Sequence, residues 1–245
     1  HDHLLKKINR KCYSIDTKRA LYLLKNAGFK VLCHFMPNLP GATPELDIDM
    51  FNTGIFDPNY DCDEWKLYPT SVTTTSNKDI EDVNTVIEKW YNDGKYIPYS
   101  DEELKEVLKY AKRHIKPHKR ISRIFRDIPV DNIIGGARTP HLRQVLQNEM
   151  ADEGDYCQCI RCREIKNNEF EIKDVFYKVD KYEASYGIEY FISANVENKH
   201  NLARPYLVGF CRLRLRNYDV VKKDFTRNYE YTNFIGVLKN CALIR

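Results

Sequence analysis

Residues 29–36 read Phe-Lys-Val-Leu-Cys-His-Phe-Met, an apolar run that predicts a buried β-strand. The turn-forming pair Pro40-Gly41 follows soon after it. The spacing of apolar residues predicts one helix before this strand, over residues 16–26, and one after it, over residues 44–56. A second short strand is predicted over residues 64–68. Helices and strands that alternate in this order predict parallel βα units, so this part of the chain is assigned to the α/β class.

The pattern changes near residue 165. Before it, helices are predicted over residues 79–91, 100–115 and 140–153. After it, apolar runs rich in Val, Ile, Phe and Tyr alternate with polar loops. These runs predict the strands of an antiparallel sheet, over residues 171–179, 186–194, 206–215 and 234–244. A domain boundary is therefore expected near residue 165.

The composition favours a soluble protein that binds a metal. The chain has 245 residues, of which 42% are hydrophobic and 30% charged, enough for a substantial core. No stretch reaches the roughly 20 apolar residues of a membrane helix, and the N-terminus has no apolar signal region, so a cytoplasmic location is expected. The first residue is not Met, which indicates a processed start or an internal piece of a longer chain. Eight cysteines without a secretion signal favour reduced thiols and a metal site.

Three of the cysteines lie within six residues: Cys157, Cys159 and Cys162. Thiolates this close can converge on one metal ion with little loss of loop entropy. The alternatives are a redox-active or merely crowded trio, or an iron–sulfur cluster. The tight spacing favours a metal, and the presence of only three nearby thiols favours structural zinc. A tetrahedral zinc site needs a fourth ligand, for which His141 is the first candidate, ahead of His114 and His118.

A basic run precedes this cluster. Seven cationic residues occur with no acidic residue among them: Lys112, Arg113, Lys116, Lys119, Arg120, Arg123 and Arg126. Such an array can neutralise RNA phosphates, although most charge runs are simply solvated surfaces. Because apolar residues interrupt the run, one face is expected to be buried while Arg120, Arg123 and Arg126 project together. We predict RNA binding by these seven residues.

His34 and Lys66 lie on, or at the end of, the two predicted parallel strands. Ligand sites of parallel α/β folds gather at the carboxyl ends of the strands. The two residues are therefore candidates for a substrate site. The alternative is that His34 is a satisfied core residue and Lys66 a solvated one, and periodicity does not choose between these readings.

Six motifs occur in an order that points to a known family. They are His-Phe-Met-Pro-Asn-Leu-Pro-Gly at 34–41, Lys-Leu-Tyr-Pro-Thr at 66–70, Tyr-Ser-Asp-Glu-Glu-Leu at 99–104, Arg-Asp-Ile-Pro at 126–129, Leu-Arg-Gln-Val-Leu at 142–146 and Cys-Gln-Cys-Ile-Arg-Cys-Arg-Glu at 157–164. Almost end to end, the chain resembles the catalytic subunit of Elongator, a tRNA uridine acetyltransferase with a radical-SAM domain. The three-cysteine version of the last motif resembles the archaeal and bacterial type.

The resemblance implies three parts. Residues 1–115 would form the C-terminal part of a radical-SAM partial TIM barrel, residues 116–165 a basic, zinc-binding linker, and residues 166–245 the N-terminal part of a GNAT acetyltransferase sheet. The family makes the carboxymethyl precursor on wobble uridine 34 of tRNA. It uses acetyl-CoA, S-adenosylmethionine and a 4Fe-4S cluster. Its partners would be tRNA and either other Elongator-type subunits or a second copy of the chain.

The family's iron–sulfur signature and its Gly-rich acetyl-CoA turn are not found among these residues. A fragment inactive on its own is therefore expected, and no catalytic residue is assigned. The alternative is a non-catalytic, zinc-stabilised tRNA-binding module. A protein acetyltransferase is a weaker third hypothesis, because it needs the acetyl-CoA motif that the sequence lacks.

Overall fold

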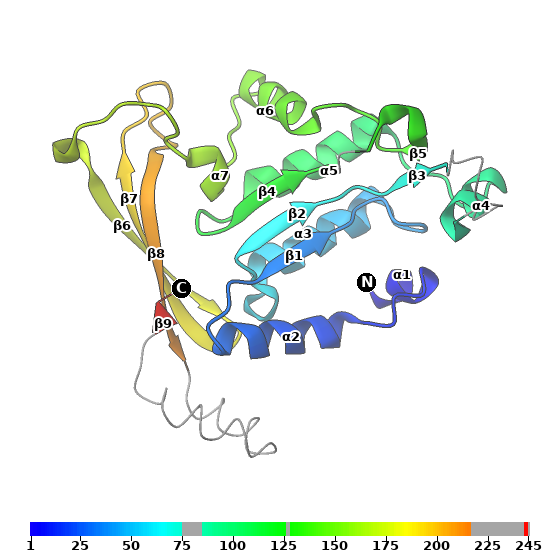
Figure 1. Cartoon of the computed structure of the whole chain (residues 1–245), viewed down its shortest axis with the longest axis horizontal. Coiled ribbons are helices and arrows are strands. Elements are labelled where there is room, and N and C mark those ends of the chain that lie inside the picture. The colour runs from blue at the N-terminus through cyan, green and yellow to red at the C-terminus, as the bar shows by residue number, and fades with distance from the viewer. Residues whose placement is uncertain (75–84, 126–127, 217–242, 245) are drawn as a thin grey trace, which may run out of the picture.

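The computed structural model describes residues 1–74, 85–125, 128–216 and 243–244 (Figure 1). The first sheet is parallel, with strand order β1-β2-β4, and its strands are β1 (Leu32–Phe35), β2 (Glu64–Leu67) and β4 (Arg120–Ile124). β1 and β2 lie within the predicted strands. The predicted mixed α/β class is confirmed, since the structure has both parallel and antiparallel sheets.

Seven α-helices are seen in the described residues: α1 (Asp2–Lys7), α2 (Ser14–Asn26), α3 (Pro44–Phe56), α4 (Val86–Asn92), α5 (Asp101–His114), α6 (Leu142–Asp152) and α7 (Ile160–Arg163). The start of α3 follows directly from the sequence. The Thr43 hydroxyl accepts a hydrogen bond from the backbone N–H of Leu46, and Pro44 takes the first helical position. The first part of the helix predicted over residues 79–91 lies outside the described residues. No described helix is long and apolar enough to cross a membrane.

Helices α3 and α5 cover one face of the parallel sheet (Figure 1). Phe35 of β1 stacks on Trp65 of β2 with ring centroids 4.1 Å apart. Gly54 of α3 faces this pair, and a Cβ there would come within 2.9 Å of either ring. The missing side chain therefore lets the helix pack closely on the sheet.

β4 lies in the middle of the basic run, where no strand was predicted. Its buried residues, Ile121 and Ile124, are three apart, which a regular strand would place on opposite faces. A β-bulge resolves this, because Ser122 is extra relative to β2: Trp65 pairs with Ile121 and Lys66 pairs with Arg123. The three-residue spacing of Ile121 and Ile124 does not match a regular strand, so the strand could not be predicted from the sequence.

A two-stranded antiparallel sheet joins β3 (Ser71–Thr73) to β5 (Ile133–Gly136). Neither strand was predicted. Gly136 has a φ of +79°, and a Cβ there would lie 2.4 Å from the carbonyl oxygen of Thr70. Both the positive φ and the close approach of the Thr70 carbonyl therefore require glycine at this strand end.

The second large sheet is antiparallel, in the order β6-β7-β8-β9. Its strands are β6 (Phe176–Ala184), β7 (Gly187–Val196), β8 (Tyr206–Arg216) and β9 (Leu243–Ile244). β6 begins five residues later than predicted, because its end is fixed by a two-residue turn of Ser185 and Tyr186, both with positive φ (+45° and +60°). This is the geometry of tight hairpin turns, but without their usual Asn-Gly sequence. Most of the strand predicted over residues 234–244 lies outside the described residues.

A cluster of buried charges joins the two large sheets. Lys25 of α2 lies 2.9 Å from Asp61, 3.7 Å from Asp63 and 3.2 Å from Glu189 of β7. Other cations complete the cluster: Lys119 binds Asp61, Arg212 binds Asp63 and Arg214 binds Glu189. We call these seven residues the inter-sheet ion cluster. Because desolvated charges are tolerated only when they are paired, this cluster fixes how the sheets meet.

Candidate metal centre and sheet-edge cavity

The three cysteines of the predicted metal site come together in the fold. The sulfur atoms of Cys157, Cys159 and Cys162 all lie within 4.8 Å of one another. Cys157 and Cys159 are buried, and Cys162 is half-buried. Soft thiolates at this mutual distance suit Zn²⁺, whose bonds to sulfur are about 2.3 Å long. In donor type and spacing, the three residues fit a zinc ion.

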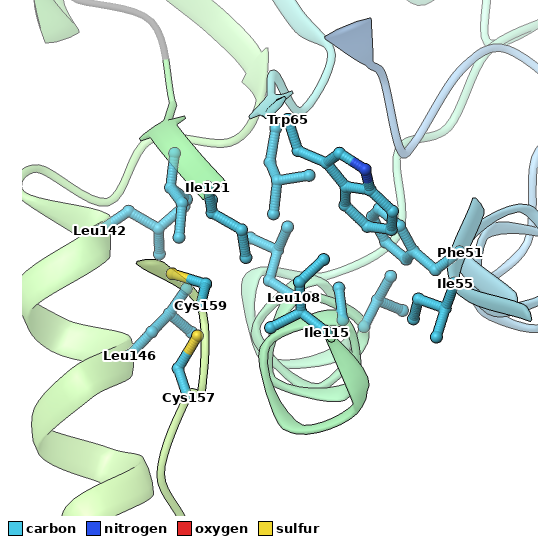
Figure 2. Packing of buried hydrophobic residues seen from close by; sticks show 14 of the residues in the cluster. Phe51, Ile55, Trp65, Leu108, Ile115, Ile121, Leu142, Leu146, Cys157 and Cys159 are labelled. Carbon is cyan, nitrogen blue, oxygen red and sulfur yellow. The ribbon is translucent and has the colours of Figure 1, made fainter. Parts of the chain in front are cut away.

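Local structure explains why the sulfurs converge. Cys159 caps the short helix α7, so Cys162 returns to the same side one turn later. The backbone N–H of Ile160 donates to the carbonyl of Lys119 at 2.9 Å, which ties α7 to the start of β4. Figure 2 shows Cys157 and Cys159 between α6, which carries Leu142 and Leu146, and α5, which carries Leu108. The three-cysteine group is thus built into the main core.

Charge around the sulfurs favours a thiolate at Cys162. Hydrogen bonds from Cys157 and Cys159, together with the nearby charges of Lys112 and Arg143, lower the pKa of Cys162 well below its usual range, although burial opposes this. The Nζ atom of Lys112 lies 4.0 Å from the Cys162 sulfur, and Nε2 of Gln147 lies 3.6 Å from it. Neither Gln147 nor Arg143 was singled out in the sequence. Only the packing of α6 against α7 reveals them.

The structure does not bring the histidine candidates to the sulfurs. Within the described residues, the group of close metal-ligand atoms contains the three cysteines alone. His141 is exposed at the N-terminal end of α6. His114 stacks on Tyr110 at the end of α5, and His118 stacks on Tyr182 of the antiparallel sheet. The described residues therefore supply three ligands, and the predicted role of His141 gains no geometric support.

The basic run does not form one surface, which corrects part of the RNA prediction. Lys112 and Lys119 are 0% exposed, the first beside Cys162 and the second bound to Asp61. They cannot reach RNA in this fold, because their charges are enclosed by protein. Arg126 lies outside the described residues.

Four members of the run reach the surface to different extents. Arg113 binds Glu153 and Asp155, and Arg120 binds Glu164. Lys116 lies over the ring of Phe56, with Nζ 4.7 Å from its centroid. Arg123 is exposed on β4. The exposed Arg161 of α7, which sequence reasoning passed over, donates to the carbonyl of Ser122 and so lies beside Arg123.

A cavity of about 940 Å³ lies at the carboxyl ends of β1 and β2. Its lining includes His34, Met36, Tyr68, Thr70, Val86 and Trp90. The hydroxyl of Thr70 is buried, with no hydrogen-bond partner in the described part of the chain. An apolar pocket of this size with a few polar groups is typical of a small-molecule site.

His34 lies at this cavity as an uncharged group at neutral pH. Partial burial and the charges of Lys66 and Arg10 lower the pKa of its imidazole. Its ring packs edge-on against Tyr68 with centroids 5.2 Å apart. Lys66 is its partner in the parallel register of β1 and β2 but is not part of the cavity lining. The two predicted residues are therefore neighbours, of which His34 faces the cavity.

Comparison with known proteins shows which family this chain is related to. Residues 62–152 match the family model described as the Radical_SAM C-terminal domain. The chain is 34% identical over 219 residues to the tRNA uridine(34) acetyltransferase of Methanocaldococcus jannaschii, a match that covers 87% of this chain and 38% of that protein. It is 30% identical over 204 residues to Elongator complex protein 3 of Homo sapiens, covering 80% of this chain and 34% of the relative. This chain is a homologue of part of the tRNA uridine(34) acetyltransferases.

Comparison of the folds also shows that this chain is a homologue of the tRNA uridine(34) acetyltransferases. A solved structure of the archaeal Methanocaldococcus infernus Elp3 with an N-terminus deletion superimposes with a TM-score of 0.77 at 33% sequence identity. The superposition covers 88% of this chain and 49% of the other. The expected resemblance is thereby confirmed, and the chain spans less than half the length of these relatives.

Proposed function

We propose that this chain contributes to the carboxymethyl modification of wobble uridine 34 in tRNA, as part of a cytoplasmic, Elongator-type acetyltransferase. The observation that carries the proposal is the juxtaposition of three features in one fold. A cavity opens at the carboxyl ends of parallel strands, a three-cysteine group lies in the core, and buried ion pairs join a second, antiparallel sheet to the first. The similarity to tRNA uridine(34) acetyltransferases supports reading them together.

In this proposal, the three parts of the chain divide the work. Residues 1–115 form the C-terminal part of a radical-SAM barrel, with His34 and Lys66 at its substrate end. Residues 116–165 are the zinc-binding linker, and residues 166–245 begin the acetyltransferase sheet. Zinc would be held by Cys157, Cys159 and Cys162 as a structural ion that joins β4 to α6 and α7. S-adenosylmethionine, a 4Fe-4S cluster and acetyl-CoA are implied by the family.

The described residues contain a single group of three close metal ligands. We assign this group to zinc. The described residues contain no second group of close thiols that could hold an iron–sulfur cluster. What these residues can contribute is binding and positioning. His34 is held neutral beside the cavity, where it can accept a hydrogen bond from a nucleoside or cofactor group. The inter-sheet ion cluster keeps the two sheets in a fixed relation, which a reaction that uses both requires.

The tRNA surface in this proposal is smaller than the basic run. It consists of the cations that reach solvent near the bulge of β4: Lys66, Lys116, Arg120, Arg123 and Arg161. Arg161 donates to the carbonyl of Ser122, the residue before Arg123, which places its guanidinium at this part of β4. Phosphate contacts from such residues position an RNA without reading its sequence. Elongator-type subunits or a second copy of the chain are the other partners we propose.

The test is tRNA binding by the whole chain as salt is raised. We compare the unmodified protein with Arg123→Gln and with the matched control Lys178→Gln, an exposed lysine of β6 on the other sheet. Loss of one phosphate contact should reduce the magnitude of the salt slope by about 0.7–0.9. Only Arg123→Gln is expected to show this reduction.

If the unmodified chain does not bind tRNA at low salt, the proposal is wrong. If it binds tRNA, the reading frame around this sequence decides between the two hypotheses. A longer frame with the iron–sulfur signature and the Gly-rich turn supports the acetyltransferase, whereas stop codons that tightly bound these residues support the non-catalytic tRNA-binding module.

A further inference from the structure

Lys112 is a fully buried lysine whose nearest partner is sulfur. Its side chain is 0% exposed, and its Nζ atom lies 4.0 Å from the sulfur of Cys162. The other buried lysines each contact carboxylates: Lys25 contacts Asp61, Lys109 contacts Glu106 and Glu153, and Lys119 contacts Asp61. No carboxylate pairs with Lys112 within the described residues. A buried ammonium group without an anion would be strongly unfavourable, so the cysteine group must supply the negative charge.

Gln147 approaches the same sulfur from a second helix. It lies on α6, and its Nε2 atom is 3.6 Å from the Cys162 sulfur. Lys112 lies on α5, so two helices each direct an N–H donor at one cysteine. An acceptor that attracts two donors, one of them charged, is better matched by a thiolate than by a neutral thiol. Cys157 and Cys159 have no comparable donor from Lys112 or Gln147 among the hydrogen bonds of the described residues.

The charge of a metal-bound trio completes the argument. A divalent ion held by three thiolates carries one net negative charge. Lys112 offsets this charge at Cys162, alongside the half-buried Arg143, whose guanidinium also interacts with the three cysteines. Donors of this kind around metal ligands commonly fix the ligand's orientation and raise metal affinity. The charge and the position of Lys112 both fit this task, and its burial excludes a contact with RNA.

We propose that Lys112 and Gln147 are positioning residues of the metal centre. Lys112 helps to neutralise the tri-thiolate complex, and both residues orient the Cys162 thiolate. This assignment rests on the zinc site of the proposed function, since it has no meaning if the three cysteines bind no metal. It also changes the role of Lys112 from a nucleic-acid contact to a support for the linker's metal.

The test measures metal affinity and the spectrum of the bound metal in the whole chain. Co²⁺ serves as a coloured substitute for Zn²⁺, because its sulfur-to-metal charge-transfer band reports thiolate ligands. Affinity is obtained by competition with a chelator of known strength. The variants are Lys112→Met, Lys112→Arg and Gln147→Leu. The controls are Lys109→Met, a buried lysine on the same helix that is paired with carboxylates, and Gln144→Leu, which removes an exposed amide of α6.

Lys112→Met is expected to weaken metal binding by about 10–100-fold and to shift the charge-transfer band. Lys112→Arg should recover most of the affinity, because it restores the charge. Gln147→Leu should weaken binding less. Lys109→Met should show neither effect: it should lower the stability of the fold while leaving metal affinity and spectrum unchanged.

The failures of the two ideas are distinguishable. If the unmodified chain binds neither Co²⁺ nor Zn²⁺, the metal site of the proposed function is wrong, and the role of Lys112 falls with it. If the unmodified chain binds metal and Lys112→Met binds it equally tightly with the same spectrum, only the role of Lys112 is wrong. Should Lys112→Met fail to fold, Gln147→Leu decides the question, since unchanged affinity and spectrum there would also overturn the assignment.

Discussion

Between the two large sheets, buried cations lie against carboxylates, whereas beside the cysteine group a buried cation lies against sulfur. The inter-sheet ion cluster contains four cations, Lys25, Lys119, Arg212 and Arg214, and three anions, Asp61, Asp63 and Glu189. Each of its four cations is paired with a carboxylate of the same cluster. At the cysteine group, the charge of Lys112 is balanced only if the thiols ionise. The first region is therefore structural by itself, and the second is where we propose a metal.

The largest effect that follows from this comparison is expected at Cys159. Replacement of this fully buried thiol in Cys159→Ala removes one of three ligands. Structural zinc can contribute about 10–16 kcal/mol of apparent folding energy in small domains, which equals or exceeds the net stability of many proteins. We expect the variant to lose its zinc after dialysis and to melt at a much lower temperature. Elemental analysis and thermal unfolding measure both, with the exposed Cys211→Ala as the control. Full zinc retention by Cys159→Ala would show that the cysteine group is not the metal site.

The next largest effect is expected in the inter-sheet ion cluster. Asp61→Asn keeps the size of the side chain but leaves Lys25 and Lys119 without their shared carboxylate. Loss of one partner from a buried ion pair typically costs about 3–5 kcal/mol. Urea denaturation should show this loss, while zinc content stays unchanged.

The control for that change is Asp93→Asn, which breaks an exposed pair with Lys95 and should cost far less stability, because solvent already screens the two charges. Equal costs for the buried and the exposed pair would mean that the inter-sheet ion cluster does not hold the sheets together.

A smaller effect is expected from the pH dependence of His118. Burial lowers the pKa of this imidazole, and Asp61 opposes the shift only in part, in a site that also contains Lys119, Arg212 and the stacked ring of Tyr182. The unfolded chain therefore binds a proton more readily than the folded chain. Stability should fall as pH is lowered below about 6.5, the ordinary value for histidine, towards the lowered folded value.

Denaturation at pH 7.5, 6.5 and 5.5 should show this decrease in the unmodified protein and a weaker decrease in His118→Gln, whatever the absolute stability of the variant (the three pH values are about one unit to each side of the ordinary histidine pKa). The carboxylate of Asp61 does not interfere, since its pKa is held well below its usual range by Lys119 and Lys25 despite burial. His114→Gln, an exposed position on α5, is the control. An identical pH dependence in His118→Gln would contradict the assignment.

The smallest effect is expected at His141. Its side chain is exposed, and its imidazole is not among the ligand atoms that lie close together in the described residues. His141→Ala should therefore leave the zinc content and the Co²⁺ spectrum unchanged. A loss of metal comparable with that of Cys159→Ala would show that His141 moves to the ion and completes the tetrahedron, as the sequence first indicated.

The sequence predicted what depends on neighbouring residues. The strands β1 and β2, the helices α3 and α5 and the cysteine group all follow from caps, apolar spacing and motif spacing. The bulge at Ser122 was not predictable, because the partner strand decides which residue is extra. The burial of Lys112 and Lys119 was not predictable either. A lysine in a sequence is expected at the surface, and only the fold shows that a sulfur group or a carboxylate lies beside it. Gln147 was missed for the same reason, because its role exists only where α6 meets α7.

The hydrogen bond from Arg214 to the side-chain oxygen of Asn26, 2.9 Å long, has a consequence for synthesis on the ribosome. The two residues are 188 positions apart in the sequence, and the ion pair between Lys25 and Glu189 likewise joins α2 to a strand that is synthesised much later. At a translation rate of about 5–20 residues per second, α2 would leave the ribosome roughly ten seconds or more before its last partners exist. During that interval Lys25 and Asn26 lack the partners on β7 and β8 that they have in the folded chain. The nascent N-terminal part is thus expected to need a chaperone or a delay in docking, and the chain should acquire its full cooperativity only when β8 arrives.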